Sequence, residues 1–273
     1  MENPENTENL SLTDVDFSVY TPLADEEGAW YCNNPIVAHA GGGYYGKTYT
    51  NCLEAMRLAV ENGINVIEVD MVVTSDNQII LKHDWDEDED GNDIVLSHKE
   101  FMSSAIERLY TPMDIYSLFE LMNSYDELYI IVDVKAPLEV YELLAEAARD
   151  TDNLELMDRF IIQLYTRDSI SQIKEIYPFP SLLYTLYVSG DRDFNAIAAF
   201  CLENDIHVIT MPVGWAASYE DELKVFNEQN VHVYVHTVND IQTVIDMNGR
   251  GISGFYSDWL RPEDLRKVGL LSD

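Results

Sequence analysis

Four short apolar stretches of this chain each end in a side chain that can bind a metal or move a proton. They are residues 35–39 (ending in His39), 66–70 (Glu68 and Asp70), 79–84 (His83 and Asp84) and 130–135 (Asp133 and Lys135). Short apolar runs rich in β-branched residues predict buried parallel strands. An α/β barrel places its active site at the carboxyl ends of such strands. The sequence therefore predicts one site with two histidines, three carboxylates and a lysine.

Strand-like and helix-like segments alternate along the rest of the chain, which predicts parallel βα units. Eight barrel strands result if 78–84 is a hairpin or continuation of the second strand. Predicted strands are 36–39, 65–74, 128–135, 160–166, 181–187, 207–213, 231–238 and 252–257, and predicted helices are 51–62, 113–125, 138–149, 169–176, 194–204, 219–230 and 241–248. The length of 273 residues suits a barrel of about 250 residues. We predict an α/β protein with a (β/α)8 TIM-barrel fold.

The chain divides into an extension and one domain. Residues 1–30 are polar and acidic, and we predict that they form an N-terminal extension. Residues 31–273 then form a single barrel domain. The stretch 85–112 interrupts the alternation of strands and helices, which predicts a small insertion after the second strand region. Its acidic run, residues 86–90, is predicted to be a solvated loop.

The charge balance excludes some partners. The chain has 50 acidic and 16 basic residues, for a net charge of -34. A surface of this charge repels nucleic acid and anionic membranes, so we expect neither as a partner. An anionic substrate would require local positive charge, which a divalent cation can supply.

The apolar segments and the cysteines indicate a soluble protein. No apolar run approaches the roughly 18 residues of a membrane span, so stable membrane insertion is not expected. The first residues lack the features of a signal peptide, and the sequence as given predicts a cytoplasmic protein, or an extracellular one if a leader has been trimmed. The three cysteines predict no disulfide framework. The oligomeric state stays open.

Three carboxylates are candidate metal ligands. Glu68 and Asp70 are two residues apart on a predicted strand, so both point to one face, and Asp133 follows on the next predicted strand. Carboxylates that converge repel one another unless a cation lies between them, and oxygen ligands suit Mg²⁺ or Ca²⁺. The alternative for such a pair is a solvated edge or a salt bridge.

Two histidines are candidates for proton transfer because imidazole titrates near neutral pH. His39 precedes a glycine-rich loop, residues 41–47, and His83 follows the hairpin strand. We do not pair His83 with Asp84, since neighbouring residues on a strand point in opposite directions. His236 is predicted to face the same mouth, where it would line the pocket or serve a structural role.

A set of motifs resembles the glycerophosphodiester phosphodiesterases, which belong to the phosphatidylinositol-phosphodiesterase-like TIM barrels. The resemblance spans about residues 35–265. The motifs are His39-x-Gly41, Asn51-x-x-Glu54-Ala55, Gly63, Ile67-Glu68-x-Asp70, Thr74-x-Asp76, His83-Asp84, Asp133-x-Lys135 and Gly254-x-x-x-Asp258.

The resemblance implies a role for each main site residue. It implies His39 and His83 as the acid–base pair, and Glu68, Asp70 and the acidic residue at position 133 as metal ligands. It also implies that Lys135 contacts the phosphate, and that the interruption after the second histidine is the small insertion typical of the family.

The chain departs from the family pattern at three places, one of which is Thr50-Asn51-Cys52, where the family usually has Glu-Asn-Thr. Ala40 stands where the family usually has an arginine that holds phosphate, and Lys47 or Arg167 could take its place. Asp133 stands where the family usually has glutamate. The resulting Asp-x-Lys form also resembles the spider-venom sphingomyelinase D branch, so the substrate remains open.

The first hypothesis is therefore metal-dependent hydrolysis of a small or lipid-derived phosphodiester, with a glycerophosphodiester as the first choice. Sphingomyelinase D-like and phosphatidylinositol phospholipase-like reactions are alternatives, and attack by water or by a substrate hydroxyl stays open. A second hypothesis is a non-catalytic barrel that binds a phospho-ligand or a protein, which the absence of arginine at position 40 favours. A third, another barrel enzyme of the aldolase or enolase kind, ranks lower because the later strands end without a lysine.

Overall fold

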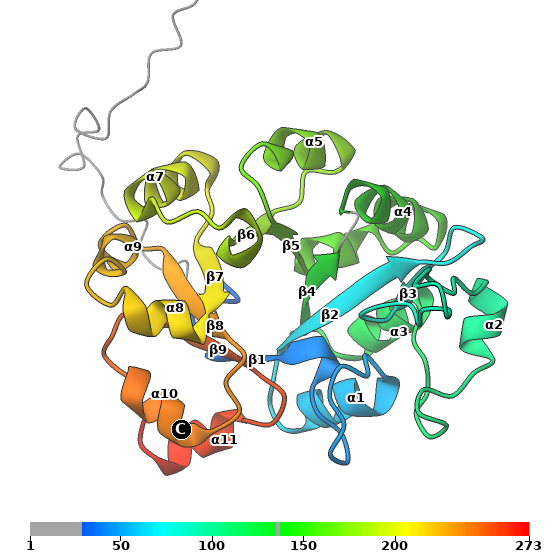
Figure 1. Cartoon of the computed structure of the whole chain (residues 1–273), viewed down its shortest axis with the longest axis horizontal. Coiled ribbons are helices and arrows are strands. Elements are labelled where there is room, and N and C mark those ends of the chain that lie inside the picture. Colours follow the sequence, from blue (N-terminus) through cyan, green and yellow to red (C-terminus); the bar gives the residue numbers. More distant parts are fainter. Residues whose placement is uncertain (1–28, 135–136, 273) are drawn as a thin grey trace, which may run out of the picture.

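A closed ring of eight parallel strands forms the centre of the computed structural model, which describes residues 29–134 and 137–272 (Figure 1). The strands are β1 (Ile36–Ala38), β2 (Val66–Val73), β4 (Tyr129–Val134), β5 (Phe160–Leu164), β6 (Ser181–Thr185), β7 (Val208–Pro212), β8 (His232–His236) and β9 (Gly254–Ser257). Pairing of β1 with both β9 and β2 closes the ring. β3 (Ile79–Leu81) pairs antiparallel with β2, outside the ring. The predicted TIM barrel, with a hairpin at its second strand, is confirmed.

Helices surround the ring of strands (Figure 1). The longer ones are α1 (Leu53–Glu61), α3 (Ile115–Ser124), α4 (Pro137–Asp150), α5 (Ser169–Ile176), α7 (Phe194–Asn204) and α10 (Ile241–Met247). Shorter helical segments are η3 (His39–Gly41), α2 (His98–Met102), η4 (Leu154–Arg159), α6 (Leu186–Ser189), α8 (Val213–Ser218), α9 (Lys224–Glu228) and α11 (Pro262–Lys267).

Three segments differ from their predicted form. The strands predicted over 181–187 and 207–213 end early because α6 and α8 begin at their carboxyl ends. The helix predicted over 219–230 is reduced to α9, since residues 220–223 form turns.

Alternation along the strands separates two cores. One cluster of apolar side chains contains one residue from each strand of the ring, including Val66, Ile131 and Ile161, and fills the barrel interior. The intervening residues, such as Ile67 and Ile130, join the larger core that also contains residues of the helices. Because side chains alternate with a period of two, the residues that follow Val66 on the interior face are Glu68 and Asp70.

Trp30 belongs to the inner core although the sequence analysis assigns it to the extension. Its side chain is 4% exposed and packs against Tyr31 and Tyr234. The Tyr234 hydroxyl donates to the backbone oxygen of Asn34 at 2.8 Å. A Cβ on Gly254 would lie 2.2 Å from the Tyr234 ring, so glycine at this position makes room for that tyrosine. Trp30, next to the predicted boundary at residue 31, therefore packs with the barrel.

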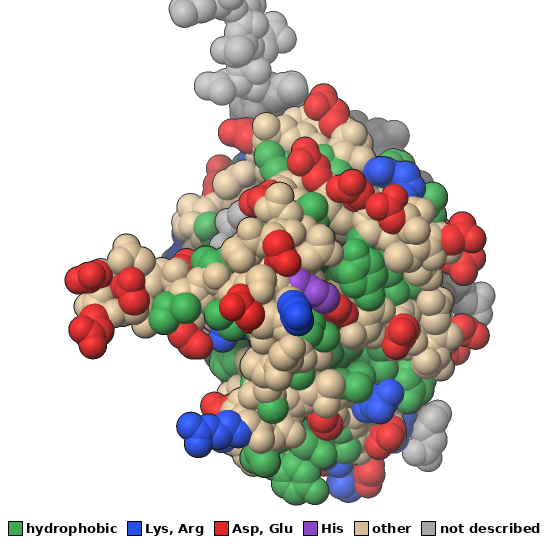
Figure 2. Space-filling model, turned by 90° about the vertical axis from the view of Figure 1, so that its right-hand side faces the viewer, with side chains coloured by type: hydrophobic (Ala, Val, Ile, Leu, Met, Phe, Trp, Pro, Cys, Tyr) green, Lys and Arg blue, Asp and Glu red, His purple; other side chains and the backbone are tan. Residues whose placement is uncertain are grey.

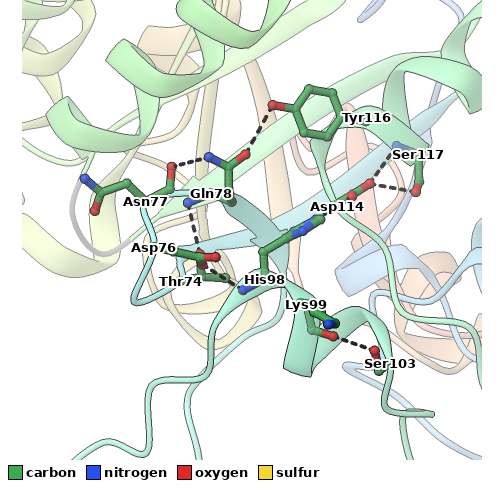
Figure 3. Close-up of polar contacts among 10 residues, drawn as sticks. All are labelled: Thr74, Asp76, Asn77, Gln78, His98, Lys99, Ser103, Asp114, Tyr116 and Ser117. Atoms are coloured by element: carbon green, nitrogen blue, oxygen red, sulfur yellow. Dashed lines mark hydrogen bonds and ion pairs between the residues drawn. The ribbon is translucent and has the colours of Figure 1, made fainter.

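Hydrogen bonds fasten the segment between β3 and α3 to the β2–β3 turn, as Figure 3 shows. Asp76 accepts a hydrogen bond from the backbone nitrogen of His98 at 2.7 Å and one from Thr74 Oγ1. The His98 ring contacts Asp114 at 2.7 Å, and Asp114 also caps α3 by accepting from the backbone nitrogen of Ser117. The predicted acidic loop carries an isolated β-bridge between Glu87 and Asp93, and residues 86–93 are all exposed.

Acidic side chains are scattered over the face drawn in Figure 2 and gather at the end of a projecting segment, whereas basic side chains are fewer. Across residues 29–134 and 137–272, no helix combines the length and the apolar character needed to cross a membrane.

Candidate active site

Three carboxylates converge inside the carboxyl end of the barrel. Asp70 and Asp133 are register partners on β2 and β4, and Glu68 points to the same face two residues before Asp70. Ligand oxygens from all three lie within 4.8 Å of one another. Glu68 and Asp70 are buried. The predicted convergence of these residues is what the barrel geometry produces.

Burial makes this cluster electrostatically costly. Burial and the neighbouring charges of Asp70 and Asp133 hold the pKa of Glu68 well above its ordinary value. Burial raises the pKa of Asp70 as well. A hard divalent cation removes this repulsion, and carboxylate oxygens are the ligands it prefers. Glu68, Asp70 and Asp133 therefore fit a divalent-metal site.

Neighbouring polar groups fix the directions of two of these carboxylates. The Asn51 side chain donates to Asp70 Oδ2 at 2.8 Å, and its oxygen accepts from the backbone nitrogen of Asp70 at 3.0 Å. Asn51 has φ of +47°, a conformation that asparagine adopts more readily than most residues. The backbone nitrogen of Ala40 donates to Glu68 Oε2 at 2.6 Å. Such outer contacts orient ligands before a metal binds.

His39 is held by an aspartate from the last strand region. Its Nδ1 lies 2.9 Å from Asp258 Oδ1. Asp258 is held in turn by Asn239, whose side-chain nitrogen donates to Asp258 Oδ2 at 2.7 Å. With Nδ1 engaged by a carboxylate, the opposite ring nitrogen is left for proton exchange.

His83 pairs with its sequence neighbour, which corrects the prediction. Its Nδ1 lies 2.5 Å from Asp84 Oδ2. The expectation that the two side chains diverge assumed a strand, but β3 ends at Leu81 and the alternation no longer applies. His83 thus has the same kind of carboxylate partner as His39.

The Tyr49 ring lies between the two histidine rings. Its centroid is 4.7 Å from that of His39 and 5.1 Å from that of His83, in edge-to-face contacts. Tyr49 is exposed at the mouth, and its φ is +57°. One exposed tyrosine ring therefore contacts both imidazoles.

Most of the predicted site residues line one pocket of about 210 Å³. Those present are His39, Glu68, Asp70, His83, Asp133 and His236. Lys47 and Arg167 lie elsewhere: Lys47 pairs with Glu107 at 3.1 Å, and the Arg167 guanidinium pairs with Asp191 and lies over the Phe200 ring. Neither is among the residues that line this pocket. Lys135 lies outside the described residues.

Several pocket residues have no assigned role in the sequence analysis. Gln163, Thr185 and Thr210 are buried polar residues on the interior face of β5, β6 and β7. Their period-two spacing from Ile161, Leu183 and Val208 is the signal that could have identified them. Tyr165 hydrogen-bonds Asp133 and accepts from the backbone nitrogen of Val134 at 2.9 Å. Its role depends on contact between neighbouring strands, which no local pattern reveals.

Known proteins that resemble this chain are glycerophosphodiester phosphodiesterases by name. A model of the glycerophosphoryl diester phosphodiesterase family matches residues 39–261. The Bacillus subtilis protein YhdW, named as a candidate glycerophosphodiester phosphodiesterase, is 23% identical over 248 residues, covering 86% of this chain and 97% of its own.

Similar solved structures include a candidate glycerophosphodiester phosphodiesterase from Galdieria sulphuraria, with a TM-score of 0.68, 16% identity and coverage of 86% and 97% of the two chains. A glycerophosphodiester phosphodiesterase from Parabacteroides distasonis has a TM-score of 0.66, 17% identity and the same coverage. An Oleispira antarctica phosphodiesterase in complex with the product sn-glycerol-3-phosphate has a TM-score of 0.62 at 14% identity, covering 83% and 94%.

Proposed function

The chain belongs to the glycerophosphoryl diester phosphodiesterase family, a family of phosphoric diester hydrolases, and we propose that it hydrolyses a glycerophosphodiester at this pocket. One observation carries the proposal. Two histidines, each paired with an aspartate, line the pocket that also contains the three-carboxylate cluster. This arrangement offers a base and an acid on either side of a bound phosphorus atom.

In the proposed reaction one imidazole acts as the base and the other as the acid. One neutral histidine takes a proton from the attacking hydroxyl as its oxygen bonds to phosphorus. The other, protonated, gives a proton to the ester oxygen as the bond from phosphorus to that oxygen breaks. Asp258 and Asp84 contact Nδ1 of the two rings and hold them in place, which leaves Nε2 of each ring to exchange the proton. Attack by water gives a phosphomonoester and an alcohol, whereas attack by a substrate hydroxyl gives a cyclic phosphate.

Glu68, Asp70 and Asp133 are the proposed metal ligands. A bound Mg²⁺ or Ca²⁺ would supply positive charge that stabilises the charge developing on the phosphate oxygens. The family is generally dependent on divalent metals, which supports this assignment.

The phosphate needs further positive charge because Ala40 replaces the usual arginine. The described residues that line the pocket include no lysine or arginine. We propose that Lys135, which follows Val134 in the sequence, contacts the phosphate, and we no longer propose Lys47 or Arg167. The Oleispira antarctica enzyme binds sn-glycerol-3-phosphate as its product, which supports a glycerophosphate product for this chain.

The experiment that tests the proposal is hydrolysis of glycerophosphodiesters and bis(p-nitrophenyl) phosphate with Mg²⁺, with Ca²⁺ and with EDTA. We expect metal-dependent turnover, and a loss of about 10²–10⁴-fold in both His39→Ala and His83→Ala. His207→Ala is the matched control, since His207 also pairs with an aspartate but lines neither pocket at the barrel mouth. Near-normal turnover in both alanine variants would reject the mechanism. Metal binding with no turnover of any phosphodiester would favour the non-catalytic binding barrel.

A further inference from the structure

An apolar groove of about 430 Å³ adjoins the proposed catalytic pocket. Five residues line both: Asp70, His83, Asp133, Gln163 and Tyr187. From this shared wall the groove extends past the carboxyl ends of β4 and β5 to α5 and α6. A substrate whose phosphorus lies at the carboxylate cluster can therefore place one of its two ester arms in the groove.

The groove beyond the shared wall carries no charge in the part of the chain that the structure describes. Its remaining lining residues are Met71, Val134, Tyr165, Thr166, Ser169, Ile173 and Val188. An ammonium or a second phosphate on the substrate would lose its hydration there without gaining a counter-charge, which is costly. An alkyl or acyl chain loses unfavourable contact with water at the same place.

The catalytic pocket itself suits the other arm. Thr185 Oγ1 and His236 Nε2 are buried there and have no hydrogen-bond partner among the described residues. A buried polar group without a partner is unfavourable, so a ligand that hydrogen-bonds to it gains affinity. Hydroxyl groups of a glycerol moiety can both donate to and accept from such atoms. The two cavities thus separate a polar arm from an apolar one.

We propose that the substrate is a phosphodiester with one glycerol arm in the catalytic pocket and one uncharged alkyl or acyl arm in the groove. This inference rests on the proposed function, and it specifies the substrate class. The groove selects the apolar arm by burial, and Val188 at its outer part, 53% exposed, contacts that arm where it leaves the cavity.

The test is kcat/KM for glycerophosphodiesters whose second arm is ethyl, butyl or hexyl. Complete burial of one methylene corresponds to about fourfold, so we expect a rise of at least about tenfold from ethyl to hexyl. A second comparison uses two substrates of the same shape that differ in charge. They are the choline ester and its neutral isostere, the 3,3-dimethylbutyl ester. We expect the neutral ester to react faster.

Val188→Asp is the variant that tests the position of the arm. We expect Val188→Asp to abolish the rise in kcat/KM from the ethyl ester to the hexyl ester. Val268→Asp is the matched control, because Val268 is 40% exposed and lines neither cavity. We expect it to keep the full dependence on chain length.

The outcomes distinguish a failure of this inference from a failure of the proposed function. Hydrolysis that is equal for all arms, or faster for the choline ester, overturns the apolar-arm assignment and leaves the phosphodiesterase in place. Retention of the chain-length rise in Val188→Asp overturns the position of the arm. Hydrolysis of none of these esters, at any metal condition, rejects the proposed function and this inference with it.

Discussion

His39 and Asp258 are 219 positions apart in the chain, yet their side chains form a contact of 2.9 Å. β1 and β9 pair in parallel with Ala38 opposite Ser257. The residues that follow these two, His39 and Asp258, therefore lie side by side. Closure of the barrel between its first and last strands is therefore the event that orients His39.

Asp258→Asn should lower kcat by about 10² or more, because the amide cannot stabilise the imidazolium as the carboxylate does. The folded state should be retained, since Asn239 can still bond to residue 258. Asp205→Asn is the control: Asp205 contacts His207 at 3.0 Å and lines neither pocket at the mouth. Steady-state kinetics on one glycerophosphodiester would check both variants. Equal activity in Asp258→Asn and wild type would show that the contact with His39 does not serve catalysis.

Asn51→Gly should weaken metal binding about 10- to 100-fold, as removal of outer contacts to metal ligands commonly does. Glycine adopts the positive φ of position 51 without strain, so the variant removes the two hydrogen bonds to Asp70 and little else. Calorimetric titration with Mg²⁺ and Ca²⁺ measures the affinity. The control is Asn77→Gly, at an exposed turn residue with φ of +57°. An unchanged affinity in Asn51→Gly would argue that Asp70 is not oriented by Asn51.

His236 should make the fold sensitive to acid. Burial, with a smaller contribution from His39, lowers the pKa of His236 to about 4. Between this value and the ordinary 6.5 the unfolded chain binds a proton that the folded chain does not, so stability falls as the pH falls through that range. The loss reaches about 3 kcal/mol by pH 4, at about 1.4 kcal/mol per pH unit.

His236→Gln should remove that part of the pH dependence. Urea unfolding in EDTA from pH 7 to pH 4.5 measures it, with His207→Gln as the histidine control. Between pH 7 and pH 4.5, the free energy of unfolding should fall more for the wild type than for His236→Gln. A constant difference across the range would contradict the assignment.

Trp30→Ala should destabilise the domain by about 3–5 kcal/mol, as deletion of a large buried aromatic side chain does. Trp30 packs on Tyr234 inside the barrel, at the end opposite the carboxylates. Tyr45→Ala, at a tyrosine 84% exposed, is the control and should change stability by less than about 0.5 kcal/mol. Denaturant unfolding measures both. A small effect at Trp30 would place the start of the stable domain after that residue.

Local patterns in the sequence were sufficient to predict that Glu68, Asp70 and Asp133 form a cluster. Glu68 and Asp70 share a face because strand side chains alternate, and Asp133 lies opposite Asp70 on the strand that pairs with theirs. The same reasoning failed for His83 and Asp84, because the strand ends at Leu81 and alternation has no meaning beyond it. No local pattern indicates which group replaces the arginine absent at position 40, and the two candidates, Lys47 and Arg167, each pair with an acidic side chain.

The sequence by itself determined the class of fold and the residues at the carboxyl ends of the strands, because both follow from short-range periodicity in apolar and polar residues. Only the tertiary structure decided which groups orient the site: Asp258 on His39, Asn51 on Asp70 and Tyr165 on Asp133. It also decided that an apolar groove adjoins the cluster. The physical reason is that these contacts join elements brought together by barrel closure, and their geometry depends on strand order and register.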